Sequence, residues 1–152
     1  MGLVVSQLTV DAHDPGALAR WWATALGWQV TWEDDDEVGL EPPDGSATSW
    51  LFLRVTDRKA GKNRLHVDLR PPDGSDQGAE LARLLDLGAA PVDIGQGPDT
   101  TWHVLADPEG NEFCLLRSTP TELVALLDAE AAAAQAAEAR AGAAVADDGP
   151  AA

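Results

Sequence analysis

The chain has little positive charge: ten lysine and arginine residues stand against 26 aspartate and glutamate residues, for a formal net charge of −16. A surface of this sign repels nucleic-acid phosphates and anionic membranes, so the composition argues against both partners. No apolar run approaches the roughly 20 residues that a bilayer-spanning helix requires. The first residues also lack the basic segment of a secretory signal, so we expect a cytoplasmic protein.

Cysteine and tyrosine are scarce as well. Cys114 is the single cysteine, which excludes an intramolecular disulfide and any zinc site made of cysteine alone. Tyrosine is absent and phenylalanine occurs twice, yet the 152 residues include six tryptophans. Hydrophobic residues make up 45% of the chain, which is enough for the core of one ordinary domain.

The composition changes near Pro120. Residues 119–152 are rich in alanine and acidic residues and form a separate tail. Thr121 can cap a helix over 121–128, which we expect to fray into disorder beyond Asp128 because little is left to bury. Residues 147–152 are expected to be disordered. A solvated tail is the simplest interpretation, and docking of a basic partner is the alternative.

Residues 1–118 repeat one order of elements, strand–helix–strand–strand–strand. The first half, residues 1–58, predicts strands at 3–11, 28–32, 38–41 and 48–55, and a helix at 17–26 between Asp14 as N-cap and Gly27. The second half, residues 62–118, predicts strands at 64–70, 90–94, 101–106 and 112–117, and a helix that Ser75 caps and Gly88 ends. Leu18-Ala19-Arg20 recurs as Leu81-Ala82-Arg83, which supports a duplication.

Three segments carry a family resemblance: Asp14-Pro15 followed by Leu18–Trp22 and Leu26-Gly27-Trp28, then Gly61–Leu69, then Ala106–Cys114. They resemble the vicinal oxygen chelate superfamily, the glyoxalase and bleomycin-resistance fold, and within it the glyoxalase-like branch. The resemblance implies an α+β fold of two βαβββ modules, which curl into a half-open cup of mixed sheet with helices on the outer face. It also implies a ligand inside the cup and a homodimer, but no particular reaction.

Metal-dependent members of that superfamily place one ligand on each of the first, fourth, fifth and eighth strands. The matching positions here are Gln7, Leu53, His66 and Cys114. Leu53 has no donor atom, Gln7 offers only an amide oxygen, and Cys114 binds a metal only as a thiolate. We therefore expect no complete metal site and no cofactor, with His66 and Gln7 as the remaining candidates for a divalent ion.

The strand predicted at 64–70 alternates clearly. Leu65, Val67 and Leu69 share one face, which we expect to pack against the helices, while His66 and Asp68 share the face toward the cup. The His66–Asp68 pair is the candidate catalytic group, as a general base oriented by a carboxylate. A satisfied polar pair at the rim is the alternative.

The same reasoning gives a set of expected ligand-binding residues. Trp21, Trp22 and Trp28 are assigned to the core, whereas Trp102 or its neighbour His103 must face the cup. The full set is Gln7, Thr9, Leu53, His66, Asp68, Trp102 and Cys114. We expect a small planar or hydrophobic molecule in a tryptophan-lined cup without a complete metal site. The alternative is a divalent-metal-dependent isomerase, lyase or dioxygenase that uses His66.

Overall fold

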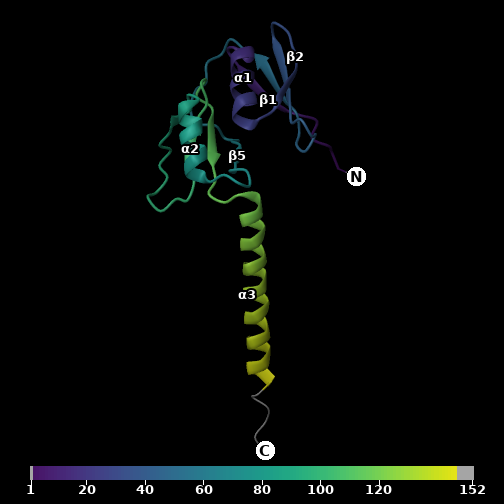
Figure 1. Cartoon of the computed structure of the whole chain (residues 1–152), viewed down its shortest axis with the longest axis vertical. Helices are drawn as coiled ribbons and strands as arrows, with labels where there is room; N and C mark the ends of the chain where they lie inside the picture. Colours follow the sequence, from purple (N-terminus) through teal and green to yellow (C-terminus); the bar gives the residue numbers. More distant parts are fainter. Residues whose placement is uncertain (1, 147–152) are drawn as a thin grey trace, which may run out of the picture.

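A computed structural model describes residues 2–146 of the chain, and the predicted disorder at 147–152 lies outside the described residues. Within this range the chain forms three helices and eight strands. In chain order they are β1 (Leu8–Ala12), α1 (Pro15–Leu26), β2 (Gln29–Glu33), β3 (Glu37–Glu41), β4 (Trp50–Arg54), β5 (Asp68–Leu69), α2 (Gln77–Asp86), β6 (Ala90–Pro91), β7 (His103–Ala106), β8 (Glu112–Leu115) and α3 (Pro120–Ala146). The predicted α+β fold with two βαβββ units is confirmed (Figure 1).

The strands form two open, mixed sheets of four. Their orders are β1-β4-β3-β2 and β5-β8-β7-β6, so the two sheets have the same topology. In each sheet the first strand pairs in parallel with the fourth, and the remaining pairs are antiparallel. In the following text, the first module means β1 to β4 with α1, and the second module means β5 to β8 with α2.

One hydrophobic core joins the two modules. It combines Trp21 and Trp22 of α1 and Phe52 of β4 with Leu84 of α2 and Phe113 of β8. Phe52 and Phe113 are at most 1% exposed. Polar contacts reinforce this junction, since the Trp21 indole donates to the Leu87 carbonyl at 3.0 Å. The modules therefore share their interior, and neither has a separate core.

Helix α1 begins and ends as the sequence predicts. The Asp14 side chain accepts a hydrogen bond from the Ala17 amide at 2.9 Å, and Pro15 occupies the first turn, where no amide proton is required. Gly27 ends the helix with a φ of 68°, a left-handed conformation that glycine adopts without steric cost. The caps thus fix the length of α1, and its apolar side covers the first sheet.

The cap predicted for the second helix is wrong. Asp76 is the N-cap of α2, because its carboxylate accepts from the Ala79 amide at 2.9 Å. The Ser75 hydroxyl instead donates to the Glu80 carboxylate at 2.8 Å. The neighbouring aspartate caps the helix one residue later, and its carboxylate is a stronger acceptor for a backbone amide than a hydroxyl is.

Two strands of the second module are much shorter than predicted. Only Asp68 and Leu69 pair as β5, where 64–70 was expected, and β6 consists of Ala90 and Pro91. The first strand is shorter too, because it starts at Leu8 and not at residue 3. Val67 and Leu69 pack against the core as expected, but Leu65 is 89% exposed. Just before β5, the Val67 carbonyl still accepts from the Cys114 amide at 2.9 Å, whereas Lys59 and Asn63 further upstream are held by the Glu112 side chain.

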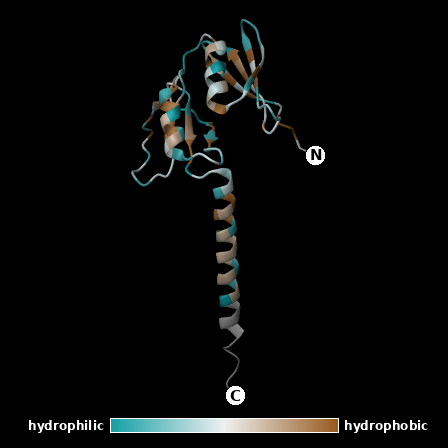
Figure 2. Cartoon of the chain, viewed as in Figure 1, coloured by the Kyte–Doolittle hydropathy of each residue, from teal (hydrophilic) through white to brown (hydrophobic). Residues whose placement is uncertain are grey.

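The tail is a long helix, and the predicted fraying beyond Asp128 is wrong up to Ala146. Helix α3 is continuous over 27 residues and extends away from the rest of the molecule (Figure 1). Its first-turn hydrogen bonds involve Thr119, whose amide and hydroxyl pair with Glu122, so Thr119 takes the capping role predicted for Thr121. Hydrophobic positions lie along the first turns of α3 (Figure 2). Leu126 and Leu127 in this part of the helix are more than half exposed.

No helix in the described part of the chain combines the length and the hydropathy that crossing a membrane would require.

Candidate functional site

A cavity of about 290 Å³ lies where the two modules meet. Strand β1 supplies Thr9 and Asp11 to its lining, and the segment before β5 supplies His66. The complete lining is Leu8, Thr9, Val10, Asp11, Trp22, Trp50, Asn63, Leu65, His66, Val67, Asp107, Asn111, Glu112 and Phe113. This volume is at the lower end of the range for small-molecule sites, about 300–1,000 Å³. Residues of both modules therefore line one cavity.

Aromatic rings form the apolar side of this cavity. The ring centroid of Trp22 lies 5.0 Å from that of Trp50 and 5.1 Å from that of Phe113, in tilted and edge-on arrangements. Trp22 comes from α1, Trp50 from β4 and Phe113 from β8, so the cluster spans both modules. Trp22 and Trp50 are 3% and 8% exposed. The rings thus belong to the core and to the cavity wall at the same time, and large rigid faces of this kind suit a planar apolar ligand.

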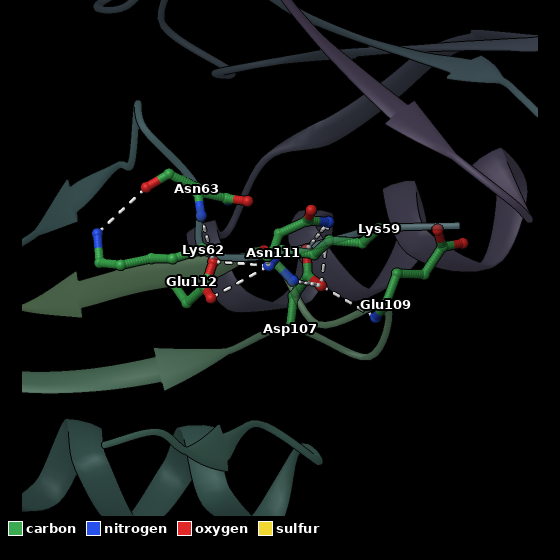
Figure 3. Close-up of polar contacts among 8 residues, drawn as sticks. Lys59, Lys62, Asn63, Asp107, Glu109, Asn111 and Glu112 are labelled. Carbon is green, nitrogen blue, oxygen red and sulfur yellow. Dashed lines mark hydrogen bonds and ion pairs between the residues drawn. The ribbon is translucent and has the colours of Figure 1, made fainter. Parts of the chain in front are cut away.

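The opposite side of the cavity is held by Glu112 at the start of β8. Its carboxylate accepts from the Asn63 amide at 3.0 Å and from the Lys59 ammonium at 3.0–3.1 Å (Figure 3). Burial acts to raise the pKa of Glu112, but these hydrogen bonds outweigh it and hold the pKa below the usual value. An ionised Glu112 thus fastens the segment between the modules onto β8, which places the residues up to His66 beside the cavity.

Asp107 anchors the turn between β7 and β8. It is 4% exposed, and its Oδ1 accepts from the amides of Glu109 and Asn111, each at 2.9 Å (Figure 3). Its Oδ2 accepts from the Trp22 indole at 3.0 Å. The Glu109 carboxylate reaches the first module too, accepting from the backbone amides of His13 and Asp14 at 2.7 and 2.8 Å. One short turn therefore joins both modules behind the cavity.

His66, Asp68 and Cys114 gather on the polar face of the second sheet. The register pairs Asp68 of β5 with Cys114 of β8. The Nδ1 atom of His66 lies 2.9 Å from Oδ1 of Asp68 and 3.8 Å from Sγ of Cys114. The side chains of His66 and Asp68 are 38% and 47% exposed, so the predicted pair faces the solvent-accessible side.

The electrostatics of this cluster keep the thiol protonated. Burial raises the pKa of Cys114 to about 11, and the charge of Asp68 and a hydrogen bond to it add to the effect. In a relay, the nucleophile contacts one nitrogen of the imidazole and the orienting carboxylate contacts the other. Here Asp68 and Cys114 both approach the same nitrogen, Nδ1 of His66. The cluster is therefore not arranged as a cysteine–histidine–aspartate relay.

The structure separates the remaining predicted site residues from this cluster. Gln7 is exposed, and its amide nitrogen lies 3.4 Å from the Thr9 hydroxyl. Leu53 pairs with Asp11 and Glu37 within the first sheet. Trp102 and His103 both line another cavity, of about 370 Å³, between α2 and the loop before β7. Thr9 and His66 are thus the two predicted ligand residues that share the cavity between the modules.

Sequence reasoning assigned Trp22 to the core, and it did not identify Trp50, Asp107 or Asn63 as site residues. The residues of Asp107–Asn111 are typical of a tight turn, but a turn motif alone does not indicate that the Asp107 carboxylate reaches a helix of the other module. A buried tryptophan nitrogen needs an acceptor, and that requirement is the signal that could have linked Trp22 to a distant carboxylate.

Paired βαβββ modules with an intervening cavity define the fold of the vicinal oxygen chelate superfamily. The chain belongs to the glyoxalase-like domain family, whose model matches residues 7–116. No curated protein matches the sequence.

Solved structures share the fold at low sequence identity. The fosfomycin resistance protein FosX from Mesorhizobium loti is 17% identical, with 82% of this chain and 99% of that chain covered and a TM-score of 0.58. A FosX mutant from Listeria monocytogenes, complexed with Mn(II) and a dihydroxypropylphosphonic acid, is 13% identical over 79% and 94% of the two chains, with a TM-score of 0.62. The bleomycin-binding protein of Streptomyces verticillus, complexed with copper(II)-bleomycin, is 17% identical over 78% and 98%, with a TM-score of 0.52.

The ligand set that the resemblance implies fits this chain only in part. Sγ of Cys114 lies 3.8 Å from Nδ1 of His66, so these two residues do come together. Leu53 contributes no donor atom, and the Gln7 side chain contacts Thr9 of the first module. Asp68, which is not part of that set, lies beside both residues. The donors near His66 therefore differ from those expected for the superfamily.

Proposed function

We propose that this protein binds a small, planar or hydrophobic molecule in the cavity between its two modules, without the complete metal site of its metal-dependent relatives. The observation that carries the proposal is the aromatic wall made by Trp22, Trp50 and Phe113. Thr9 and His66 supply polar groups at the edge of the same cavity, which would orient the ligand. Leu53 leaves the expected metal set without one of its donors.

The test is a fluorescence titration with 2-naphthol, a neutral planar molecule of two rings. Saturable quenching of tryptophan fluorescence is expected, with a Kd on the order of 0.1–1 mM for a ligand of this size. Thr9→Phe places a ring in the cavity and should abolish saturation, whereas Thr48→Phe, at an exposed loop position, should leave the Kd unchanged. Equal binding by wild type and Thr9→Phe would place the ligand elsewhere and contradict the proposal.

A divalent-metal-dependent enzyme is the second candidate, as an isomerase, lyase or dioxygenase that uses His66. The observation that favours it is the presence of Asp68 and Cys114 beside His66 on the open face of the second sheet. Turnover of a substrate that stops with a chelator and with His66→Ala would select this candidate over simple binding.

We also propose that the protein is a cytoplasmic homodimer. The exposed polar face that carries His66 and Asp68 is available to be covered by a second copy, and a single free cysteine suits a reducing compartment. Light scattering that returns twice the 16.0 kDa chain mass supports the dimer, and the single-chain mass contradicts it.

A further inference from the structure

We infer that Leu65 closes over a planar molecule bound in the cavity between the modules, an inference that rests on the proposed function. Leu65 lines this cavity, yet it is 89% exposed. A leucine exposed to this extent keeps apolar surface in water, and removal of that surface from water is favourable. A bound apolar ring supplies the surface against which the side chain can be covered.

The short span of residues 64–66 is held at both ends but not in between. Upstream, the Asn63 amide donates to the Glu112 carboxylate at 3.0 Å. Downstream, the Val67 carbonyl accepts from the Cys114 amide at 2.9 Å. Within the described part of the chain, no backbone hydrogen bond holds the three residues of the span itself. Its central side chain therefore changes position without the loss of a backbone hydrogen bond, as in other weakly held segments.

The apolar lining of the cavity has a buried part and an exposed part. Trp22 and Trp50 are 3% and 8% exposed, whereas Leu8 of β1 is 37% exposed. Leu65 is the most exposed apolar residue of the lining. A planar molecule that lies against the aromatic wall with one face still has a second apolar face in water. Leu65 is the side chain that the structure provides to cover that second face.

Closure by a leucine narrows the class of ligand. An isobutyl group has no hydrogen-bond donor or acceptor, so it packs on an apolar ring face and leaves any polar substituent on that face without a partner. Polar side chains of the lining, such as Thr9 and His66, serve substituents at the edge of the ring. We therefore expect a flat ligand with two apolar faces and with its polar groups in the plane of the ring.

The test compares 2-naphthol binding by the full-length wild type and three variants. Leu65→Ser should raise the Kd about three- to tenfold, because the variant no longer buries an aliphatic side chain on binding. Leu65→Met keeps an apolar side chain of similar volume and should stay within about twofold of wild type. Leu3→Ser is the matched control, since Leu3 is 105% exposed and lies outside the cavity lining, and it should also stay within about twofold.

Two further measurements separate ligand contact from an effect on folding. Because Leu65 is exposed in the free protein, Leu65→Ser should leave the midpoint of urea unfolding unchanged. A methyl ¹³C–¹H spectrum of the wild type needs no variant for its result. The Leu65 methyl signals should move upfield as 2-naphthol is added, since the face of a bound ring shields them, whereas the Leu3 methyl signals should not move.

Saturable binding by the wild type, with an unchanged Kd in Leu65→Ser and unmoved Leu65 methyl signals, would overturn the inference and leave the proposed ligand site intact. Absence of saturable binding by the wild type would remove both. The two failures are therefore distinguishable. Light scattering covers one other occupant: if Leu65→Ser halves the mass of a dimer but keeps the Kd, Leu65 lies between two copies of the chain, and the inference is also overturned.

Discussion

The indole nitrogen of Trp22 donates a hydrogen bond of 3.0 Å to Oδ2 of Asp107, across 85 positions of the chain. Both side chains are buried, and both border the cavity between the modules. Since Oδ1 of the same carboxylate organises the turn before β8, one side chain ties the turn, the first helix and the wall of the cavity together. The stability of the domain and the shape of the candidate site thus depend on the same contact.

Trp22→Phe removes the indole donor and leaves Oδ2 of Asp107 without this partner. A hydrogen bond to a buried charged group contributes about 1.5–3 kcal/mol, so we expect the free energy of unfolding to fall by at least that amount. Urea unfolding followed by circular dichroism measures the change. Trp32→Phe, at a position that is 45% exposed, is the control and should stay within about 0.5 kcal/mol of wild type. Equal effects of the two substitutions would show that the contact is not important for stability.

Glu109→Ala should weaken the contact between the turn that precedes β8 and the first module. Its carboxylate accepts from the amides of His13 and Asp14, which directly precede α1. Loss of these two hydrogen bonds returns both amides to water. We expect the free energy of unfolding, measured in urea, to fall by about 1–3 kcal/mol. Glu138→Ala, on the exposed part of α3, provides a matched control with the same loss of charge. Glu109→Gln retains one acceptor oxygen and should recover part of the loss.

Cys114 should react slowly with iodoacetamide at neutral pH. With a pKa of about 11 and a buried side chain, its thiolate fraction at pH 7 is on the order of 10⁻⁴, against a few per cent for an ordinary thiol. The rate of alkylation should rise about tenfold for each pH unit up to about pH 10, as long as the protein remains folded.

Asp68→Asn tests the direction in which Asp68 shifts the pKa of Cys114. Because the negative charge of Asp68 and its hydrogen bond both raise the pKa of Cys114, their removal should lower that pKa and accelerate alkylation at pH 8. Mass spectrometry of samples taken over time measures the rate. Slower alkylation in Asp68→Asn than in wild type would contradict the electrostatic account of the cluster.

Removal of residues 129–152 should leave the folded domain intact. The side chains from Ala129 to Arg140 are exposed, so their loss should change the free energy of unfolding by less than about 0.5 kcal/mol while lowering the helical circular dichroism signal. Removal of residues 120–152 is the contrasting deletion and should destabilise the domain more. It also removes Thr121, whose amide and hydroxyl both donate to Asp73. Equal stability of the two deletions would contradict a role for the first turn of α3.

Much of the fold could be predicted because it depends on local signals. The caps at Asp14 and Gly27 are properties of short segments, and the structure confirms them. The length of β5 could not be predicted in this way. The residues before it are held by Glu112 through Asn63 and Lys59, a contact 49 to 53 positions away that no local pattern indicates.

The candidate site was predictable to a smaller extent. Strand alternation placed His66 and Asp68 on one face, and the family resemblance placed Cys114 in the same ligand set as His66. The register of β5 with β8 brings the three residues together. Alternation within a strand does not determine which residues of two modules meet across a junction. The separation of Trp102 from His66, and the place of Trp22 and Trp50 in the cavity wall, both follow from that packing.

The most direct test of the central claim is a two-dimensional ¹⁵N–¹H spectrum of the six tryptophan indoles during titration with 2-naphthol. If the cavity between the modules binds a planar molecule, the indole signals of Trp22 and Trp50 will shift in a saturable manner. Those of Trp32 and Trp102, which lie away from the cavity lining, will stay in place. Shifts confined to Trp32 or Trp102, or no saturable shift at all, would contradict the account.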